Sequence, residues 1–395
     1  MRKISHYIQG DQAIWGIVAL LSLFSFLPVY SASSNLVYVL GVGSVTGHLM
    51  KHIAIVCIGF ILMYAVHRIP FRYFGGLSLI GLPIVWLLLV YTAFQGTVID
   101  GANASRWIQI PIIGVSFQTS TLASVVLMVY VARYLSVNKE KVITFWRSAL
   151  VLWLPVAIVV GTILPANLST AALLTGLVVM LAFIGGYPVK YLLAMSGVAV
   201  VFLTLFVMTA KAYPDAFPNR VDTWMSRIES FTGGGDMNTD YQIERAKTAI
   251  ATGGVLGKGA GKSVMKNLLP QSTSDFIYAI ITEEYGMLGG LSLLFLYLLL
   301  LFRIFRSAYK TEHFFGQLLI IGLGLPIIVQ ALVNMGVAVS IFPVTGQPLP
   351  LISSGGTSIW MTFLALGIIQ SVLANRTTKE EDNNNNPLAI LSETL

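Results

Sequence analysis

The sequence predicts an all-α polytopic membrane protein with about ten transmembrane helices, and three observations support this fold class. Of the 395 residues, 56% are apolar and only 10% are charged, whereas soluble domains carry about 25% charged residues. The apolar residues form ten long runs, and a spanning helix needs about 20 such residues. The runs lack the period-two alternation of barrel strands, so each is predicted to be a helix that satisfies its own backbone hydrogen bonds.

The ten runs are expected at 12–31, 51–67, 74–94, 112–132, 147–165, 168–186, 191–212, 284–303, 315–339 and 356–374. The first run is expected to stay in the protein, because no small-residue cleavage site follows it closely. The chain therefore divides into helices one to seven within 1–212, a large polar loop at 213–283, helices eight to ten within 284–375, and a tail at 376–395. The tail contains four consecutive asparagines and is predicted to be disordered.

The formal net charge of +7 is explained by topology. With the amino terminus inside, the inner segments hold fourteen Lys and Arg residues and the outer segments and helix ends hold three, which is the asymmetry expected of cytoplasmic loops. Both termini are then cytoplasmic, and the 213–283 loop lies outside with balanced charges. The net charge therefore does not indicate a nucleic-acid partner.

The outer loop is predicted to be partly structured. A helix is expected from Asp240, with Ile243, Ala246 and Ile250 on one face and Gly253-Gly254 at its end. Every charged side chain between 245 and 266 is positive, and such a stretch beside a membrane could bind lipid phosphate or pyrophosphate, or meet anionic headgroups without specificity. These cations are Arg245, Lys247, Lys258, Lys262 and Lys266.

The stretch 257–263 ends like a phosphate-binding loop but fails the full pattern. The pattern requires a glycine five residues before Gly261, and that position is Leu256. The glycines are instead expected to form a tight turn near the membrane.

Three carboxylates precede or enter the eighth predicted helix: Asp275, Glu283 and Glu284. A carboxylate close to the bilayer is costly and is a candidate functional group. Asp275 lies between a polar loop and an apolar helix, where it could act as a general base or cap the helix. Glu283 and Glu284 could bind substrate or pair with loop cations such as Arg245.

The last outer loop, 342–358, carries three prolines and three glycines in an apolar setting. This composition favours a rigid re-entrant turn, which a membrane protein tolerates only where the backbone is buried in protein or lines a cavity. Gln330 and Asn334 share one face of the preceding helix, where they could line a polar cavity or bond a neighbouring helix.

Three ordered motifs resemble the signatures of the SEDS (shape, elongation, division, sporulation) family. The first runs from Asp240 through Gly261-Lys262-Ser263 to Ser274-Asp275-Phe276-Ile277-Tyr278 and Glu283-Glu284-Tyr285-Gly286. The second is Pro343 to Ser358, which includes Ser353, Gly355 and Gly356, and the third is Gly101 to Ile108, which includes Arg106. The resemblance covers roughly residues 10–375, shares the layout of ten spans with one large outer loop, and is closer to the division type than to the elongation type.

The resemblance implies a peptidoglycan glycosyltransferase that polymerises lipid II beside a class B penicillin-binding transpeptidase. The family's essential aspartate falls on Asp275, which then acts as the general base for the acceptor hydroxyl. The leaving pyrophosphate needs cations or a divalent metal such as Mg²⁺. Arg106, Arg245, Lys258 and Lys262 are the candidate cations, and Glu283, Glu284, Ser353, Gly355 and Gly356 complete the expected substrate-binding set.

One segment departs from the family pattern. Where the family has an acid and, three residues on, a base, this chain has Thr121 and Ser124. If the missing pair is a mutual buried pair, its joint replacement by small polar groups is nearly neutral. If the pair contacts substrate, activity or specificity changes. Two other functions therefore stay open from sequence: a lipid II flippase, and a non-catalytic scaffold for a partner synthase.

Overall fold

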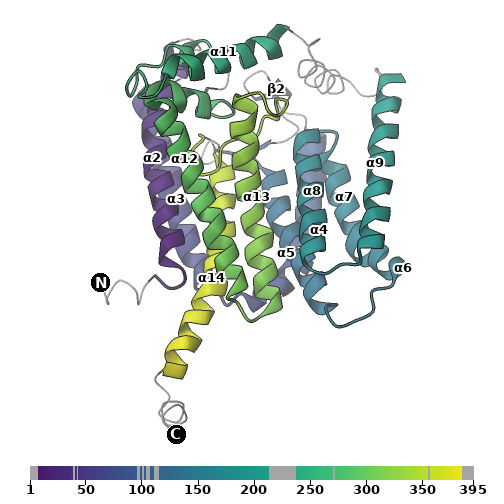
Figure 1. The fold of residues 1–395 in the computed structure, drawn as a ribbon. Helices are drawn as coiled ribbons and strands as arrows, with labels where there is room; N and C mark the ends of the chain where they lie inside the picture. Colours follow the sequence, from purple (N-terminus) through teal and green to yellow (C-terminus); the bar gives the residue numbers. More distant parts are fainter. Residues whose placement is uncertain are drawn as a thin grey trace.

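In the computed structural model, the chain is a bundle of long helices (Figure 1). The structure describes residues 8–38, 41, 43–95, 98–99, 102–103, 107–110, 115–212, 237–269, 272–354 and 356–384. Within this part of the chain, nine helices are long and apolar enough to cross a membrane, and one further apolar helix has 17 residues. The fold class predicted from the sequence is confirmed.

The helices follow the order of the predicted runs. They are α2 (Gln12–Tyr38), α3 (Val45–His67), α4 (Arg72–Gln95), α5 (Thr119–Val137), α6 (Phe145–Ser148) continued by the π-helical turn η1 (Ala149–Trp153) and α7 (Leu154–Ile163), α8 (Leu168–Ile184), α9 (Val189–Ala212), α12 (Ile277–Tyr309), α13 (Phe314–Ala338) and α14 (Thr357–Asn384). Between α9 and α12 lie α11 (Met237–Gly253) and the short 3₁₀ turn η3 (Met265–Asn267).

The fourth helix begins later than the sequence predicted. Instead of a helix from residue 112, the structure has a hairpin of β3 (Trp107–Ile110) and β4 (Val115–Gln118), with Trp107 opposite Gln118. Apolar and polar residues alternate along β4 (Val-Ser-Phe-Gln), which is the period of a strand and not of a helix. A smaller pair of two-residue strands, β1 (Val98–Ile99) and β2 (Ala102–Asn103), precedes this hairpin.

Two helices at the end of the chain are longer than predicted. Helix α12 begins at Ile277, inside the predicted outer loop, and has a non-helical residue at Gly286. Helix α14 continues to Asn384, where a disordered tail was expected from 376. The residues that follow the apolar part of α14 include Lys379, Glu380 and Glu381, which are good helix formers, and adding residues to an existing helix is easier than starting one.

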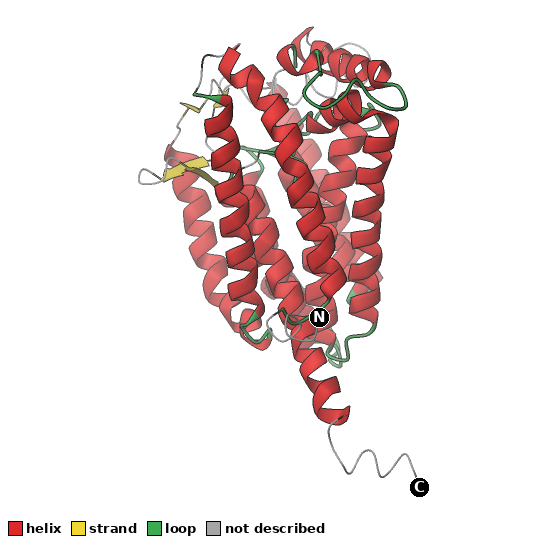
Figure 2. Cartoon of the chain, turned by 90° about the vertical axis from the view of Figure 1, so that its left-hand side faces the viewer, coloured by secondary structure: helices red, strands yellow, loops and turns green. Residues whose placement is uncertain are grey.

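The bundle has two distinct ends. One end, called the loop end, carries α11, the β strands and the start of α12 (Figures 1 and 2). The other end, called the terminal end, is where α2 begins and α14 leaves the bundle (Figure 2). At the terminal end, Asp11 accepts a hydrogen bond from Arg303 at 2.7 Å, and its backbone exchanges hydrogen bonds with the Gln370 side chain. The first helix is therefore joined to α12 and α14.

Helices α13 and α14 form the centre of the bundle and α9 lies at its edge (Figure 1). In α13 and α14, 72% of an 18-residue apolar stretch is buried within the protein, against 6% in α9. A helix that is apolar but unburied within the protein is suited to contact with lipid. The candidate site is built at the loop end of the central helices.

Candidate functional site

The segment that precedes α12 is held through its backbone. Three consecutive carbonyl oxygens accept hydrogen bonds: that of Thr273 from the Ser354 amide at 2.9 Å, that of Ser274 from the Ser353 hydroxyl at 2.6 Å, and that of Asp275 from the Asn334 amide at 2.8 Å. The Asp275 side chain is half-buried. The N-cap position of α12 is Phe276, so the capping alternative for Asp275 does not describe this geometry.

The Ser353 and Asn334 donors are fixed by the loop between α13 and α14. Asn334 also donates to the Gln347 carbonyl at 2.8 Å, and Gln330 donates to the Pro348 carbonyl at 2.8 Å. Ser353 accepts from the Leu349 amide at 2.7 Å. Gln330 and Asn334 thus bond backbone carbonyls of the loop, whereas the sequence predicted that they line a polar cavity or bond a neighbouring helix. The backbone groups of a buried irregular loop need hydrogen-bond partners, and these two side chains supply them.

The same loop is strained and deeply buried. Leu351 has a φ of 64° and no exposed surface, and a branched side chain in the left-handed region costs energy that the surrounding structure must offset. Tyr297 of α12 donates to the Pro350 carbonyl, and Gln347 donates to the Thr170 hydroxyl at 2.7 Å. The part of the loop from Leu349 to Ser353 is therefore buried in protein, which is the setting that irregular backbone in a membrane protein requires.

The β3–β4 hairpin is joined to the same region. The Gln118 amide donates to the Thr357 hydroxyl at 3.1 Å, which connects the end of β4 to the first residue of α14. The third motif of the sequence analysis ends in β3, so all three motifs reach one end of the bundle. Arg106 and Gly355 lie outside the described residues.

Glu283 is buried and its carboxylate is fully used. It accepts from Lys258 at 2.6 Å and from the Val264 and Met265 amides at 3.2 Å each. The Ser263 hydroxyl donates to it as well. The expected pairing with a loop cation is therefore found, but the cation is Lys258 and not Arg245, whose guanidinium lies 4.8 Å from the ring centre of Tyr241.

Two glycines explain why Lys258 reaches Glu283. Gly257 has a φ of 81° and Gly286 a φ of 70°, and a Cβ on either would overlap the other's backbone. This close approach lets the Lys258 amide donate to the Glu283 carbonyl at 3.0 Å. The glycine-rich stretch is thus the tight turn that the sequence predicted, and it folds back onto the kink in α12.

Glu284 connects three elements that are distant in sequence. Its Oε1 accepts from the Ser31 hydroxyl of α2 and from the Ser263 amide at 3.4 Å. Lys266 donates to Ser31 at 3.3 Å. The other Glu284 oxygen is buried and has no hydrogen-bond partner among the described residues. The sequence does not indicate this role of Ser31, because nothing in an apolar helix marks one serine as a partner for a carboxylate in another helix.

The remaining predicted site residues differ in their surroundings. Lys262 is exposed and has no ion pair among the described residues. Ser353 is buried and belongs to the backbone clamp, the three hydrogen bonds to the carbonyls of Thr273, Ser274 and Asp275. Gly356 has a φ of 54°. In the segment that differs from the family pattern, Thr121 donates to the Gln118 carbonyl at 2.8 Å and Ser124 to the Ser120 carbonyl at 2.9 Å. Thr121 thus bonds the residue that precedes α5, and Ser124 bonds a carbonyl within α5.

The fold and the site define a multi-pass helical membrane protein with a backbone-clamped aspartate beside a buried re-entrant turn. A family model described as "Cell cycle protein" and named for FtsW, RodA and SpoVE matches residues 11–378. The chain belongs to this family.

Relatives and solved structures agree with this membership. The chain is 30% identical to the probable peptidoglycan glycosyltransferase FtsW of Hydrogenovibrio crunogenus, over 91% of this chain and 90% of that protein. It is 31% identical to the protein of the same name from Geobacter metallireducens, over 94% and 96%.

Among solved structures, the chain resembles one described as "Structural coordination of polymerization and crosslinking by a peptidoglycan synthase complex". The TM-score is 0.73 and the identity is 25%, over 93% of this chain and 98% of that chain. It also resembles the rod shape determining protein RodA of Thermus thermophilus, with a TM-score of 0.67 and 25% identity over 94% and 99%.

Proposed function

We propose that this chain is a peptidoglycan glycosyltransferase that polymerises lipid II into β-1,4 glycan strands at the outer face of the bacterial cytoplasmic membrane, in septal wall synthesis during cell division. Family membership and the relatives' names support the reaction class and the division role. The observation that carries the proposal is Asp275, whose backbone is clamped by the re-entrant turn while its side chain stays half-buried.

Asp275 acts as the general base. The 4-hydroxyl of the acceptor sugar attacks the anomeric carbon of the donor, Asp275 takes the hydroxyl proton, and the polyprenyl pyrophosphate leaves. Direct displacement converts the α linkage of the donor into a β linkage. A carboxylate must lie within hydrogen-bond reach of the hydroxyl to do this, and the three clamped carbonyls from 273 to 275 hold the backbone of Asp275 in place.

Cations of the outer loop stabilise the leaving pyrophosphate. Lys262 is suited to this role because it is exposed and holds no ion pair among the described residues. Arg245 is half-buried on α11, and Arg106 belongs to the third motif. Lys258 is a weaker candidate for binding the pyrophosphate, because its ammonium group already forms an ion pair with Glu283.

A divalent cation such as Mg²⁺ is proposed only as a companion of the pyrophosphate. Among the described residues, no group of three His, Cys, Asp or Glu could hold a metal ion. This chain therefore offers no ligand set of its own in that part of the sequence, and no step of the mechanism depends on the metal.

The membrane orientation follows from the Lys and Arg distribution. The loop end faces outside and both termini lie in the cytoplasm. A class B penicillin-binding transpeptidase is the proposed partner, since polymerised strands need crosslinking. The resemblance to a chain of a peptidoglycan synthase complex supports such a partnership.

The test uses the full chain, purified with its transpeptidase partner and supplied with labelled lipid II. The native protein should form glycan chains, and Asp275→Ala should lower the rate by roughly 10²- to 10⁴-fold. Glu140→Ala is the control, because Glu140 is an exposed acid outside all three motifs, and it should polymerise normally.

The alternatives give different results in the same experiment. Equal polymer from the native protein and Asp275→Ala would refute the role of Asp275 and favour a scaffold. Lipid II that crosses vesicle membranes without polymerisation would favour a flippase. Folding and partner binding of each variant are checked by thermal unfolding and co-purification.

A further inference from the structure

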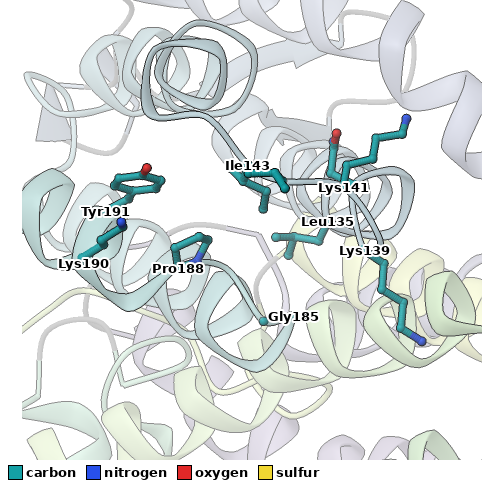
Figure 3. A pocket seen from close by; sticks show the side chains of 11 residues that line it. Leu135, Lys139, Lys141, Ile143, Gly185, Pro188, Lys190 and Tyr191 are labelled. Carbon is teal, nitrogen blue, oxygen red and sulfur yellow. The ribbon is translucent and has the colours of Figure 1, made fainter.

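A cavity of about 350 Å³ (Figure 3) lies where α9 begins, at the end of the bundle opposite to α11 (Figure 1). It is bounded by the end of α5 and the segment that follows it, by the turn between α8 and α9, and by the start of α9. The candidate catalytic site uses none of its residues. Its volume is in the range of small-molecule and headgroup sites.

The lining of this cavity carries positive charge only. It includes Lys139, Lys141 and Lys190 and no acidic residue. Figure 3 shows Lys190 and Tyr191 on one side and Lys139 and Lys141 on the other, with the ammonium groups of Lys139 and Lys141 directed outward from the rim. Asn138 and the Tyr191 ring add polar groups. Glu140, the acid next in sequence, is exposed and does not line the cavity.

None of the three lysines has an ion pair among the residues that the structure describes, where the ion pairs are Lys258–Glu283 and Arg303–Asp11. Two of the ammonium groups lie over aromatic rings, Lys139 at 4.4 Å from the ring centre of Phe314 and Lys190 at 5.0 Å from that of Tyr191. All three lysine side chains are exposed, and such contacts are weak at exposed sites, so an anion at the rim of the cavity can compete for these charges.

The wall formed by the α8–α9 turn is rigid. Gly186 has a φ of 76°, and the Tyr187 amide donates to the Ala182 carbonyl at 3.0 Å, which closes the helix in a Schellman turn. The buried Tyr187 hydroxyl bonds Ser148 at 2.7 Å and Trp153 at 3.1 Å. The turn that borders the cavity is thus fixed by hydrogen bonds from Tyr187 to α6 and η1.

Apolar side chains stand beside the lysines on both sides of the cavity. Val142 follows Lys141 and is 96% exposed, and Val189 precedes Lys190 and is 52% exposed. Trp146, on α6, is 74% exposed. Indole rings and lysines with long apolar stems are typical of the membrane interface. A ligand that satisfies this arrangement carries both a negative headgroup and hydrocarbon.

We propose that this cavity binds the phosphate headgroup of an anionic phospholipid, with its acyl chains lying against α9. Basic pockets between transmembrane helices are suited to such headgroups. Helix α9 begins at the cavity and buries only 6% of its apolar stretch within the protein, so its surface is open to acyl chains. The bound lipid would join α9 to the segment after α5. This inference rests on the proposed membrane orientation in one respect only, which is that the lipid comes from the inner leaflet.

The test measures lipid binding to the delipidated full chain and does not depend on polymerase activity. Phosphatidylglycerol, phosphatidylcholine and inorganic phosphate are titrated separately, and bound lipid is counted by native mass spectrometry. Phosphatidylglycerol should bind at least tenfold more tightly than phosphatidylcholine. The triple variant Lys139→Gln, Lys141→Gln, Lys190→Gln should weaken its binding on the order of a hundredfold.

Two control variants isolate the cavity. Replacement of the same lysines by arginine keeps the charge and should keep the binding. Arg72→Gln, Arg306→Gln, Lys310→Gln removes three exposed cations of the terminal end that do not line the cavity, and it should change phosphatidylglycerol affinity less than threefold. If the two triple glutamine variants lose phosphatidylglycerol affinity equally, the proposed site is wrong and the binding is nonspecific charge attraction. Equal affinity for inorganic phosphate and phosphatidylglycerol would overturn the lipid and indicate a free anion.

Discussion

Asp275 precedes α12 and Glu283 lies within its first turns, and the two residues are held in opposite ways. Asp275 is fixed through its backbone carbonyl, and its side chain remains half-buried. Glu283 is fully buried, and its carboxylate accepts four hydrogen bonds from the glycine-rich turn and η3. The comparison separates two ways of fixing an acidic residue, through its backbone as at Asp275 and through its carboxylate as at Glu283. Asp275 has a positioned backbone and a half-buried side chain, whereas the hydrogen bonds that hold Glu283 are made to its carboxylate itself.

Gly286→Ala should give the largest structural effect, because Gly286 supports the architecture around Glu283. A Cβ there would overlap the backbone of the glycine-rich turn, and the φ of 70° disfavours any side chain. We expect a loss of about 3 kcal/mol or more in stability, measured by chemical or thermal unfolding in detergent. Gly176→Ala is the control, because a Cβ on Gly176 meets nothing within 4 Å. Equal stability of the two variants would contradict the close approach of α12 and the turn.

Glu283→Gln should reduce stability by about 1–3 kcal/mol, since the buried donors around it lose a charged acceptor. The effect stays below that of Gly286→Ala because Lys258 is 31% exposed and can be solvated. A double-mutant cycle with Lys258→Met should show coupling between the two residues. Additive effects would mean that the ion pair does not support the turn.

Ser353→Ala tests the other half of the comparison, the backbone clamp. Loss of the hydroxyl leaves the Ser274 carbonyl and the Leu349 amide without this partner. We expect polymerisation to fall roughly tenfold with KM for lipid II little changed, because the base is displaced and not removed. Thr362→Ala is a matched control, since that hydroxyl bonds only within α14 at 3.2 Å in the described contacts. Normal kcat in Ser353→Ala would contradict a positioning role.

Lys262→Gln should have the smallest effect. The side chain is exposed, so stability should be unchanged, and the loss of one exposed cation should raise KM for lipid II about two- to fivefold. The increase should shrink as salt is raised, because salt screens exposed charges. A KM that does not change at low salt would remove Lys262 from the substrate-binding set.

The apolar runs were sufficient to predict the membrane helices, and helical periodicity predicted the loop helix. Ala246, on the predicted inner face of α11, is completely buried. The β3–β4 hairpin was missed because β4 directly adjoins α5, so the apolar residues from 112 onward were read as part of the same helix.

Within the candidate site, the motifs led to Asp275 but not to the contacts that hold it. Asn334 and Ser354 bond the segment 273–275 only after the chain has passed along α12 and back along α13. Contacts between residues so distant in sequence leave no local pattern. The pairing of Glu283 with Lys258, and not with Arg245, depends on the close approach of Gly257 and Gly286. Backbone contact between two glycines distant in sequence follows from the three-dimensional packing and not from either glycine alone.

The central claim is tested most directly by measuring lipid II polymerisation and thermal stability in the same preparations of Asp275→Asn and Glu283→Gln, each with its transpeptidase partner. The account predicts that Asp275→Asn polymerises roughly 10²- to 10⁴-fold more slowly with an unchanged Tm. Glu283→Gln should lower the Tm while the fraction that remains folded still polymerises. An Asp275→Asn protein that is folded, bound to its partner and fully active would contradict the account.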